Sequence, residues 1–115
     1  PETNLMGIYQ IYKGEDDASH IEPLPPDSPF WSSVKTTETM FLKEFPAGTF
    51  LDWHPAPRKQ VVIIISGTLE HGFEDGSKHR FGPGDVRVLV DTTGRGHTTR
   101  VVGDEPLLVA VIPLA

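Results

Sequence analysis

The sequence contains no cysteine, so neither a disulfide nor a thiolate takes part in its fold or its chemistry. Reactive groups must therefore come from histidine, carboxylate, amide and hydroxyl side chains. Basic residues are also few, because ten lysines and arginines stand against sixteen acidic residues, which gives a formal net charge of −6 at pH 7. A surface of this sign repels phosphate groups. We therefore expect neither nucleic acid nor an anionic membrane among the partners of this protein.

Long apolar runs are absent as well. No segment approaches the roughly 20 apolar residues that span a bilayer. The first ten residues, PETNLMGIYQ, lack the charged-then-apolar pattern of a secretory signal. We expect a cytoplasmic protein, and the 115 residues fit a single domain.

No window shows the 3.6-residue apolar period of a helix. Short β-prone runs separated by Gly, Pro and Asp follow one another from residue 38 to the end. The most β-prone run is residues 59–66, which has five consecutive β-branched residues. Asp75 and Gly76 are typical of a hairpin turn. About eight strands at short, regular spacing predict an all-β sandwich or barrel over residues 38–115.

Residues 1–37 have a different character. Residues 5–13 predict a first strand, and residues 23–29 contain four prolines, which favour an extended arm. Phe30 and Trp31 are the expected apolar anchor of this arm, on the barrel or on a partner subunit. A strand and an arm outside the barrel offer edges to a second copy, so we expect a homodimer.

One spacing stands out in the middle of the chain. Gly48 is followed by five residues and His54, then Ala56, then Gln60 after three more residues, then Gly67 after six more. These intervals resemble the first motif of the cupin family, G-x5-H-x-H-x3,4-E-x6-G. Two residue types differ from that motif, since alanine replaces the second histidine and glutamine replaces the acid.

A second segment resembles the other cupin motif, G-x5-P-x-G-x2-H-x3-N, more loosely. Gly94 and His97 match it, whereas Thr92 and Val101 stand where the family has Pro and Asn. Residues 82–85, GPGD, resemble the turn that cupins place before this segment. The resemblance covers about residues 38–113 and implies a jelly-roll barrel, the cupin double-stranded β-helix.

The resemblance also implies a divalent metal at the mouth of the barrel. In cupins both histidines and the acid of the first motif, and the histidine of the second, bind the metal. Carried over to this chain, the set becomes His54, Gln60 and His97, with no ligand at Ala56. An amide oxygen is a poorer ligand than a carboxylate. Gln60 therefore has two interpretations: a ligand, or a group that holds a neighbouring histidine.

Side chains two residues apart on a strand share a face. If His54 points into the barrel, Asp52 and Phe50 are expected to do the same, and His71 shares a face with Leu69 and Phe73. Asp52 or His71 is therefore a candidate for the missing ligand, and the imidazoles favour Mn, Fe, Ni, Cu or Zn. Each also has a structural interpretation: His71 as a pocket-lining histidine, and Asp52 as a group that orients Arg58 or an imidazole.

Three further features remain. Arg95, in the polar loop before His97, is a candidate rim residue that meets an acidic substrate. His20 and His79 are expected on the surface, in a polar arm and beside a hairpin turn. The tyrosines, Tyr9 and Tyr12, both lie in the first predicted strand.

Two functions from different classes follow. The first is an enzyme with one divalent metal that acts on a small organic molecule by Lewis-acid or oxygen chemistry, and the neutral Gln60 favours an anionic substrate. The alternative is a metal-free or metal-vestigial cupin that binds a small ligand as a sensor or storage module, which the substitutions at Ala56 and Gln60 favour. A metal-free acid–base sugar epimerase ranks below both, because it needs a histidine–carboxylate pair opposite a tyrosine.

Overall fold

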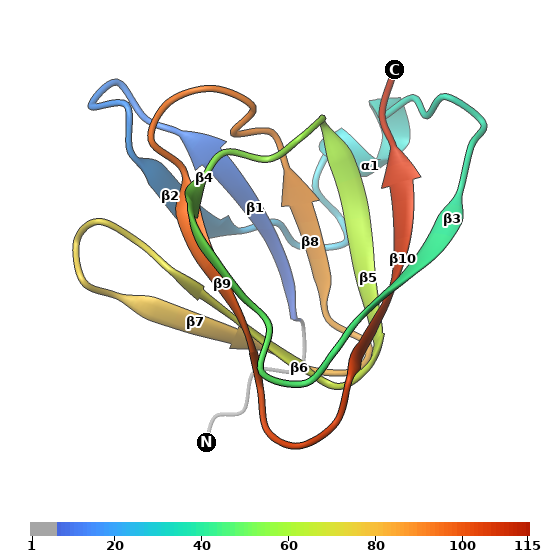
Figure 1. Ribbon diagram of the computed structural model, residues 1–115. Helices are drawn as coiled ribbons and strands as arrows, with labels where there is room; N and C mark the ends of the chain where they lie inside the picture. Colours follow the sequence, from blue (N-terminus) through green and yellow to red (C-terminus); the bar gives the residue numbers. More distant parts are fainter. Residues whose placement is uncertain (1–6) are drawn as a thin grey trace.

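Two β-sheets face each other across the core of this protein (Figure 1). The structure is a computed structural model that describes residues 7–115. The larger sheet has the strand order β2-β1-β8-β5-β10-β3, and the smaller sheet has the order β4-β9-β6-β7. The larger sheet consists of β1 (Ile8–Lys13), β2 (Ser19–Pro23), β3 (Phe41–Phe45), β5 (Gln60–Ser66), β8 (Val86–Leu89) and β10 (Leu107–Pro113). The smaller sheet consists of β4 (Phe50–His54), β6 (Thr68–Gly72), β7 (Lys78–Phe81) and β9 (His97–Val102).

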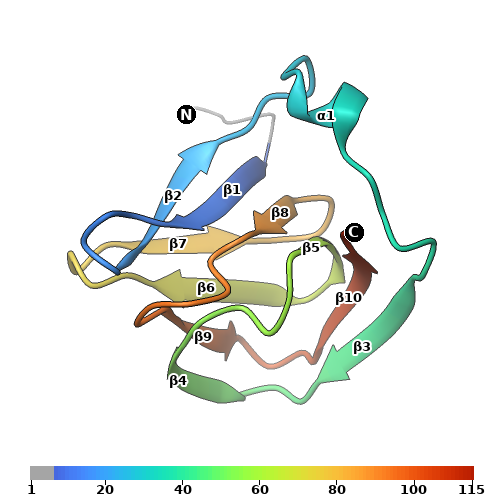
Figure 2. The ribbon, with the colours of Figure 1, turned by 90° about the horizontal axis from the view of Figure 1, so that it is seen from above.

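The chain alternates between the sheets from β3 to β6, as a jelly roll requires. β3 and β5 belong to the larger sheet, whereas β4 and β6 belong to the smaller one. All strand pairs are antiparallel except that of β1 with β8. Seen from above, the strands enclose a central space, with β3 and β4 next to each other on one side (Figure 2). The predicted all-β jelly roll is confirmed.

The strand β5 is covered on both faces from Gln60 to Ile64, which explains the apolar run there, whereas Ile65 is exposed. Val62 and Ile64 face the space between the sheets and join the main core. Val61 and Ile63 face outward, where Leu24 and Trp31 pack over them in a second cluster. The arm therefore packs on the barrel, with Phe30 and Trp31 in that second cluster, as the sequence predicts.

The turn from β5 to β6 depends on Gly67, the last residue of the first motif. Its φ is +88°, and an added Cβ would collide with the backbone of Pro106 and Leu107. Only glycine meets both conditions without strain. The chain can therefore leave one sheet and enter the other within one residue.

The N-terminal part contains two elements that the sequence does not predict. Ser19–Pro23 forms β2 and pairs with β1 across a turn in which Asp17 has a φ of +66°. The helix α1 (Phe30–Ser33) follows the prolines. β1 begins at Ile8, and residues 5 and 6 of the expected first strand lie outside the described residues. Both strands belong to the larger sheet, so β1 and β2 extend the barrel wall.

Within residues 7–115, no helix is long and apolar enough to cross a membrane.

Candidate functional site

A cavity of about 280 Å³ lies between the two sheets. Its lining includes His54 from β4, His71 from β6 and His97 from β9. The charged side chains that line it are Lys43, Arg58 and Arg87. No aspartate or glutamate of the described part of the chain belongs to this lining. The cavity is therefore cationic, although the protein as a whole is acidic.

His54 is the last residue of β4 and is half-buried. Its Nδ1 donates a hydrogen bond to the backbone oxygen of Asp52 at 2.6 Å. Because a carbonyl oxygen only accepts, the proton lies on Nδ1 and the Nε2 lone pair stays open. Gly96, with a φ of +80°, packs so closely on the His54 backbone that no Cβ fits there. This contact holds the start of β9 beside the end of β4.

His97 is the first residue of β9 and is almost fully buried. Its Nδ1 donates to Oδ2 of Asp91 at 2.7 Å, and Asp91 is fully buried. Ser19 of β2 donates to the same oxygen at 2.5 Å. A carboxylate on Nδ1 fixes the ring orientation and the tautomer, which leaves the Nε2 lone pair as a hydrogen-bond acceptor. The rings of His54 and His97 lie 4.9 Å apart, centre to centre, so both open Nε2 atoms belong to one cluster.

His71 is also buried, but both of its ring nitrogens have partners. Nε2 accepts a hydrogen bond from Nη1 of Arg87 at 2.7 Å, and Nδ1 donates to the backbone oxygen of Thr98 at 3.2 Å. Burial holds the pKa of His71 well below its ordinary value, and the charge of Arg87 lowers this pKa further. His71 is therefore a neutral imidazole whose lone pair is used by an arginine.

Arg87 is the least expected side chain in the cavity. It lies on β8 and is 7% exposed. Burial lowers its pKa to about 9, and the charge of Asp91 opposes this shift. A group with this pKa remains a cation at neutral pH. No carboxylate of residues 7–115 forms an ion pair with it, and its Nε has no hydrogen-bond partner among them.

The remaining first-motif positions also line the cavity. Gln60 begins β5 and is 7% exposed. Its Oε1 accepts a hydrogen bond from Nη1 of Arg58 at 2.8 Å. Ala56 is buried in the main core, and its backbone N–H donates to the backbone oxygen of Asp91 at 2.9 Å. The motif spacing therefore places His54, Ala56, Gln60 and His97 around one cavity.

Phe50 and Asp52 do not share a face with His54, which corrects an expectation from the sequence. Leu51 pairs with Thr99, and His54 pairs with His97. Between these two pairs the chain advances by three residues on β4 but by only two residues on β9. This bulge shifts the alternation by one residue. Leu51 lines the cavity beside His54, whereas Phe50 and Asp52 are exposed outside it. Phe50 packs on Arg100, and the Asp52 carboxylate accepts from the backbone N–H of Trp53.

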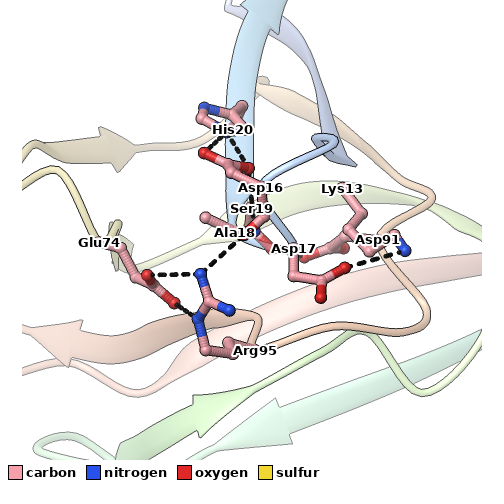
Figure 3. A network of polar contacts seen from close by, with 9 residues as sticks. All are labelled: Lys13, Asp16, Asp17, Ala18, Ser19, His20, Glu74, Asp91 and Arg95. Carbon is pink, nitrogen blue, oxygen red and sulfur yellow. Dashed lines mark hydrogen bonds and ion pairs between the residues drawn. The ribbon is translucent and has the colours of Figure 1, made fainter.

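Arg95 also lies away from the cavity lining. Its guanidinium forms an ion pair with Glu74 and donates to the backbone oxygen of Asp16 (Figure 3). The loop before β9 is thereby tied to the β1–β2 turn. His20 bonds to Asp16 near the surface, whereas the half-buried His79 packs on the ring of Tyr9. Neither Tyr9 nor Tyr12 lines the cavity.

Comparisons with known proteins agree on the fold. No family model matches the sequence, and no curated protein matches it in sequence. Solved structures do match. The DMSP lyase DddQ from Ruegeria pomeroyi DSS-3 is 24% identical with a TM-score of 0.51, over 66% of this chain and 37% of DddQ. A cupin domain from Bordetella pertussis is 19% identical with a TM-score of 0.50, over 66% of this chain and 79% of that one.

A DUF861 family protein from Thermotoga maritima matches most of the chain. It is 22% identical with a TM-score of 0.51, over 90% of this chain and 96% of its own. The 115-residue chain therefore has the cupin fold, like these structures. The cupin barrel explains why His54 and His97, 43 positions apart in the sequence, meet at one cavity. The likeness extends to the fold and not to an activity, and the chain spans only about a third of DddQ.

The residues of this cupin barrel do not make up a complete metal site. His54 and His97 each offer one open Nε2 atom. The lone pair of His71 accepts from Arg87, Asp52 points outside, and Ala56 has no donor. Among residues 7–115, no group of three His, Cys, Asp or Glu side chains is placed to hold a metal. Two imidazoles and an amide that already accepts from Arg58 fall short of the usual ligand set, so the donor chemistry does not fit a resident divalent metal.

Two of the site residues were missed from the sequence. Asp91 stands in a polar loop that resembles an ordinary turn, and Arg87 stands in the strand-forming run DVRVLV. The one available signal was the position of Arg87 between two valines in a run that is otherwise apolar. The partners of both residues lie on other strands, 6 and 16 positions away along the chain.

Proposed function

We propose that this protein binds a small organic molecule inside the barrel and needs no resident metal to do so. The observation that supports this function is the pair of imidazoles at the cavity. His54 and His97 have their Nδ1 protons committed to an oxygen partner, and both Nε2 atoms remain open. Each can accept a hydrogen bond from a ligand hydroxyl or amide. The apolar walls around them suit the body of such a ligand.

His54 and His97 could also transfer a proton to or from a bound molecule. His97 is oriented by a buried carboxylate, as in the histidine–carboxylate pairs that act as general bases. An acid or base that lines the cavity can exchange a proton with a molecule bound there. Binding is therefore the function proposed here, and acid–base chemistry on the bound molecule is the activity that the same residues would support.

A ligand screen in chelator tests the proposal. The full chain would be heated with small organic molecules in the presence of EDTA. A ligand at ten times its Kd should stabilise the protein by about 1.4 kcal/mol and raise Tm by about 4 to 6 °C. His97→Ala should reduce this shift strongly, and His20→Ala, near the surface, should not. A screen in which compounds stabilise the protein only when a metal is added would contradict the proposal.

A mononuclear metal enzyme is the second candidate. The two open Nε2 atoms favour it, as does the carboxylate of Asp91 on His97, which is a common support for metal-binding histidines. DddQ, which shares the fold, is named a lyase. Mn, Fe, Ni, Cu or Zn are the metals that imidazole ligands favour, but two imidazoles leave the ligand set incomplete, so this candidate needs further ligands from water or a bound molecule.

Metal analysis separates the two candidates. Protein purified without added metal should contain below roughly a tenth of an equivalent of metal per chain if the leading proposal holds. About one equivalent in the wild type, lost in both His54→Ala and His97→Ala, would favour the metal enzyme. Added Mn, Fe, Ni, Cu or Zn should likewise leave Tm unchanged.

We also propose that two copies associate, but through a surface other than the N-terminal strand and arm on which the sequence-based expectation rested, because β1 is an interior strand and the arm packs on the barrel. Exposed large apolar side chains gather on β3 and β4 and in the residue before β3, among them Met40, Leu42 and Trp53. β3 and β4 are also edge strands of their sheets, so both have an unpaired edge. A cytoplasmic location stays a prediction from the sequence.

A further inference from the structure

Arg87 is a buried cation that forms no ion pair with any carboxylate of residues 7–115. It is 7% exposed, and within residues 7–115 its side chain donates one hydrogen bond, to the neutral imidazole of His71 at 2.7 Å. Its Nε has no partner among residues 7–115, and the ring of Phe81 lies 5.9 Å below the guanidinium. A buried charge is costly unless it is paired. Burying the guanidinium of Arg87 therefore destabilises the free protein, and an anion that pairs with it would offset this cost.

The other charged groups of the cavity reinforce the same preference. Lys43 lies over the ring of Phe45, and Arg58 lies over the ring of Phe41 while donating to Gln60. Both are thus held at the cavity wall by aromatic faces. Within the described part of the chain no carboxylate lines this cavity, and Asp91 lies behind His97 rather than facing the cavity. The acidic residues that make the protein negative lie elsewhere.

The geometry selects among anions. A guanidinium is a planar fork that matches the two oxygens of a carboxylate. The cavity holds about 280 Å³, near the lower limit for small-molecule sites, and most of its remaining lining is aliphatic. A small carboxylate with a compact apolar body fits both features. Inorganic phosphate or sulfate would use the charge but leave the aliphatic walls without a partner.

We infer that the cavity binds a small organic carboxylate, whose carboxylate group pairs with Arg87 and whose polar substituents reach His54 and His97. This inference rests on the proposed function, because it names the class of ligand that the same cavity takes. His71 has a positioning role in it. Its lone pair holds one arm of Arg87, which leaves the rest of the guanidinium fork for the ligand.

The experiment compares carboxylates with their neutral amides. Isobutyrate and isobutyramide, benzoate and benzamide, and lactate and lactamide would be titrated into the full chain in EDTA by calorimetry. Inorganic phosphate and sulfate would be titrated in parallel. At least one carboxylate should bind about tenfold more tightly than its amide, because only the carboxylate forms the charge-assisted pair.

Variants then assign the preference to one side chain. Arg87→Met should weaken binding of that carboxylate about tenfold and bring it to the level of the amide. Arg87→Gln, which keeps a donor for His71, should do the same, so a folding defect in one variant leaves the other as the test. Arg80→Met is the matched control, because Arg80 is an exposed arginine paired with Glu70. The affinity of this variant for the carboxylate should stay within about twofold of that of the wild type.

Four results would overturn the inference. If amides bind as tightly as carboxylates and His97→Ala abolishes both, the proposed function stands and the ligand class is wrong. If carboxylate binding is unchanged in both Arg87 variants, Arg87 is not the anchor. If phosphate or sulfate binds as tightly as any carboxylate, the site takes an inorganic ion. If no member of the panel binds and the wider screen is also negative, both this inference and the proposed function fail.

Discussion

The two faces of β8 differ sharply although they belong to the same four residues. Arg87 and Leu89 point into the cavity, whereas Val86 and Val88 point outward beneath the N-terminal arm. Every member of the outer cluster is hydrophobic, and burial alone holds it together. The inner face contains a cation, and the facing sheet contributes three histidines. Both faces are buried, so burial alone does not explain the polar groups on one of them. The ligand binding that we propose would account for them.

The largest effect is expected from moving the charge to the other face. Val88 is fully buried in the outer cluster. Val88→Arg therefore buries an arginine side chain among hydrophobic residues, where neither an imidazole nor a ligand can pair with it. We expect the free energy of unfolding to fall by about 3 to 5 kcal/mol, measured by urea denaturation. Val86→Arg, at a half-buried position on the same face, should cost less. A loss below about 1 kcal/mol for Val88→Arg would remove the contrast between the faces.

The next effect concerns the carboxylate behind His97. Asp91→Asn puts an amide N–H₂ where a fully buried carboxylate accepts from Ser19 and His97. Weaker hydrogen bonds and an unsatisfied donor should lower the free energy of unfolding by about 2 kcal/mol. Ser19→Ala removes one donor and keeps the acid, so it should cost about 1 kcal/mol. Equal, negligible losses in both variants would show that Asp91 does not stabilise His97.

A smaller effect, spread over pH, comes from His71. Its folded pKa is lowered by burial, whereas its unfolded pKa is ordinary, so below about pH 6.5 the unfolded chain binds a proton that the folded chain does not. Stability from this residue is therefore lost as pH falls, by at most about 1.4 kcal/mol per pH unit. His71→Gln should flatten the fall in unfolding free energy between about pH 6.5 and 5, and His20→Gln should not. An unchanged slope in His71→Gln would contradict the neutral, buried state.

The smallest effect on stability is expected at the proposed contact between copies. Leu42 is exposed, so Leu42→Lys should change the free energy of unfolding by less than about 0.5 kcal/mol. The same substitution should convert a dimer to a monomer in sedimentation equilibrium, because a cation replaces an apolar contact. Lys78→Glu, on the distant edge strand β7, is the control and should leave the mass unchanged. A monomeric wild type would end the proposal.

The sequence predicted the fold better than the site, for physical reasons that particular residues illustrate. The interval from Gly48 to Gly67 is local in the chain, so the turns and the positions of His54, Gln60 and Gly67 could be foreseen. The bulge before His54 could not, because it depends on how β4 pairs with β9, and it moved Phe50 and Asp52 out of the site. Arg87 and Asp91 became site residues only through partners on other strands.

Nitrogen NMR of the histidine rings, in EDTA, tests the central claim most directly. The account predicts that His54, His71 and His97 carry their protons on Nδ1 near neutral pH. It also predicts that a bound small carboxylate, such as isobutyrate, shifts the Nε2 resonances of His54 and His97 without any metal. Nε2 resonances that ignore every organic ligand and respond only to a stoichiometric divalent metal would contradict it.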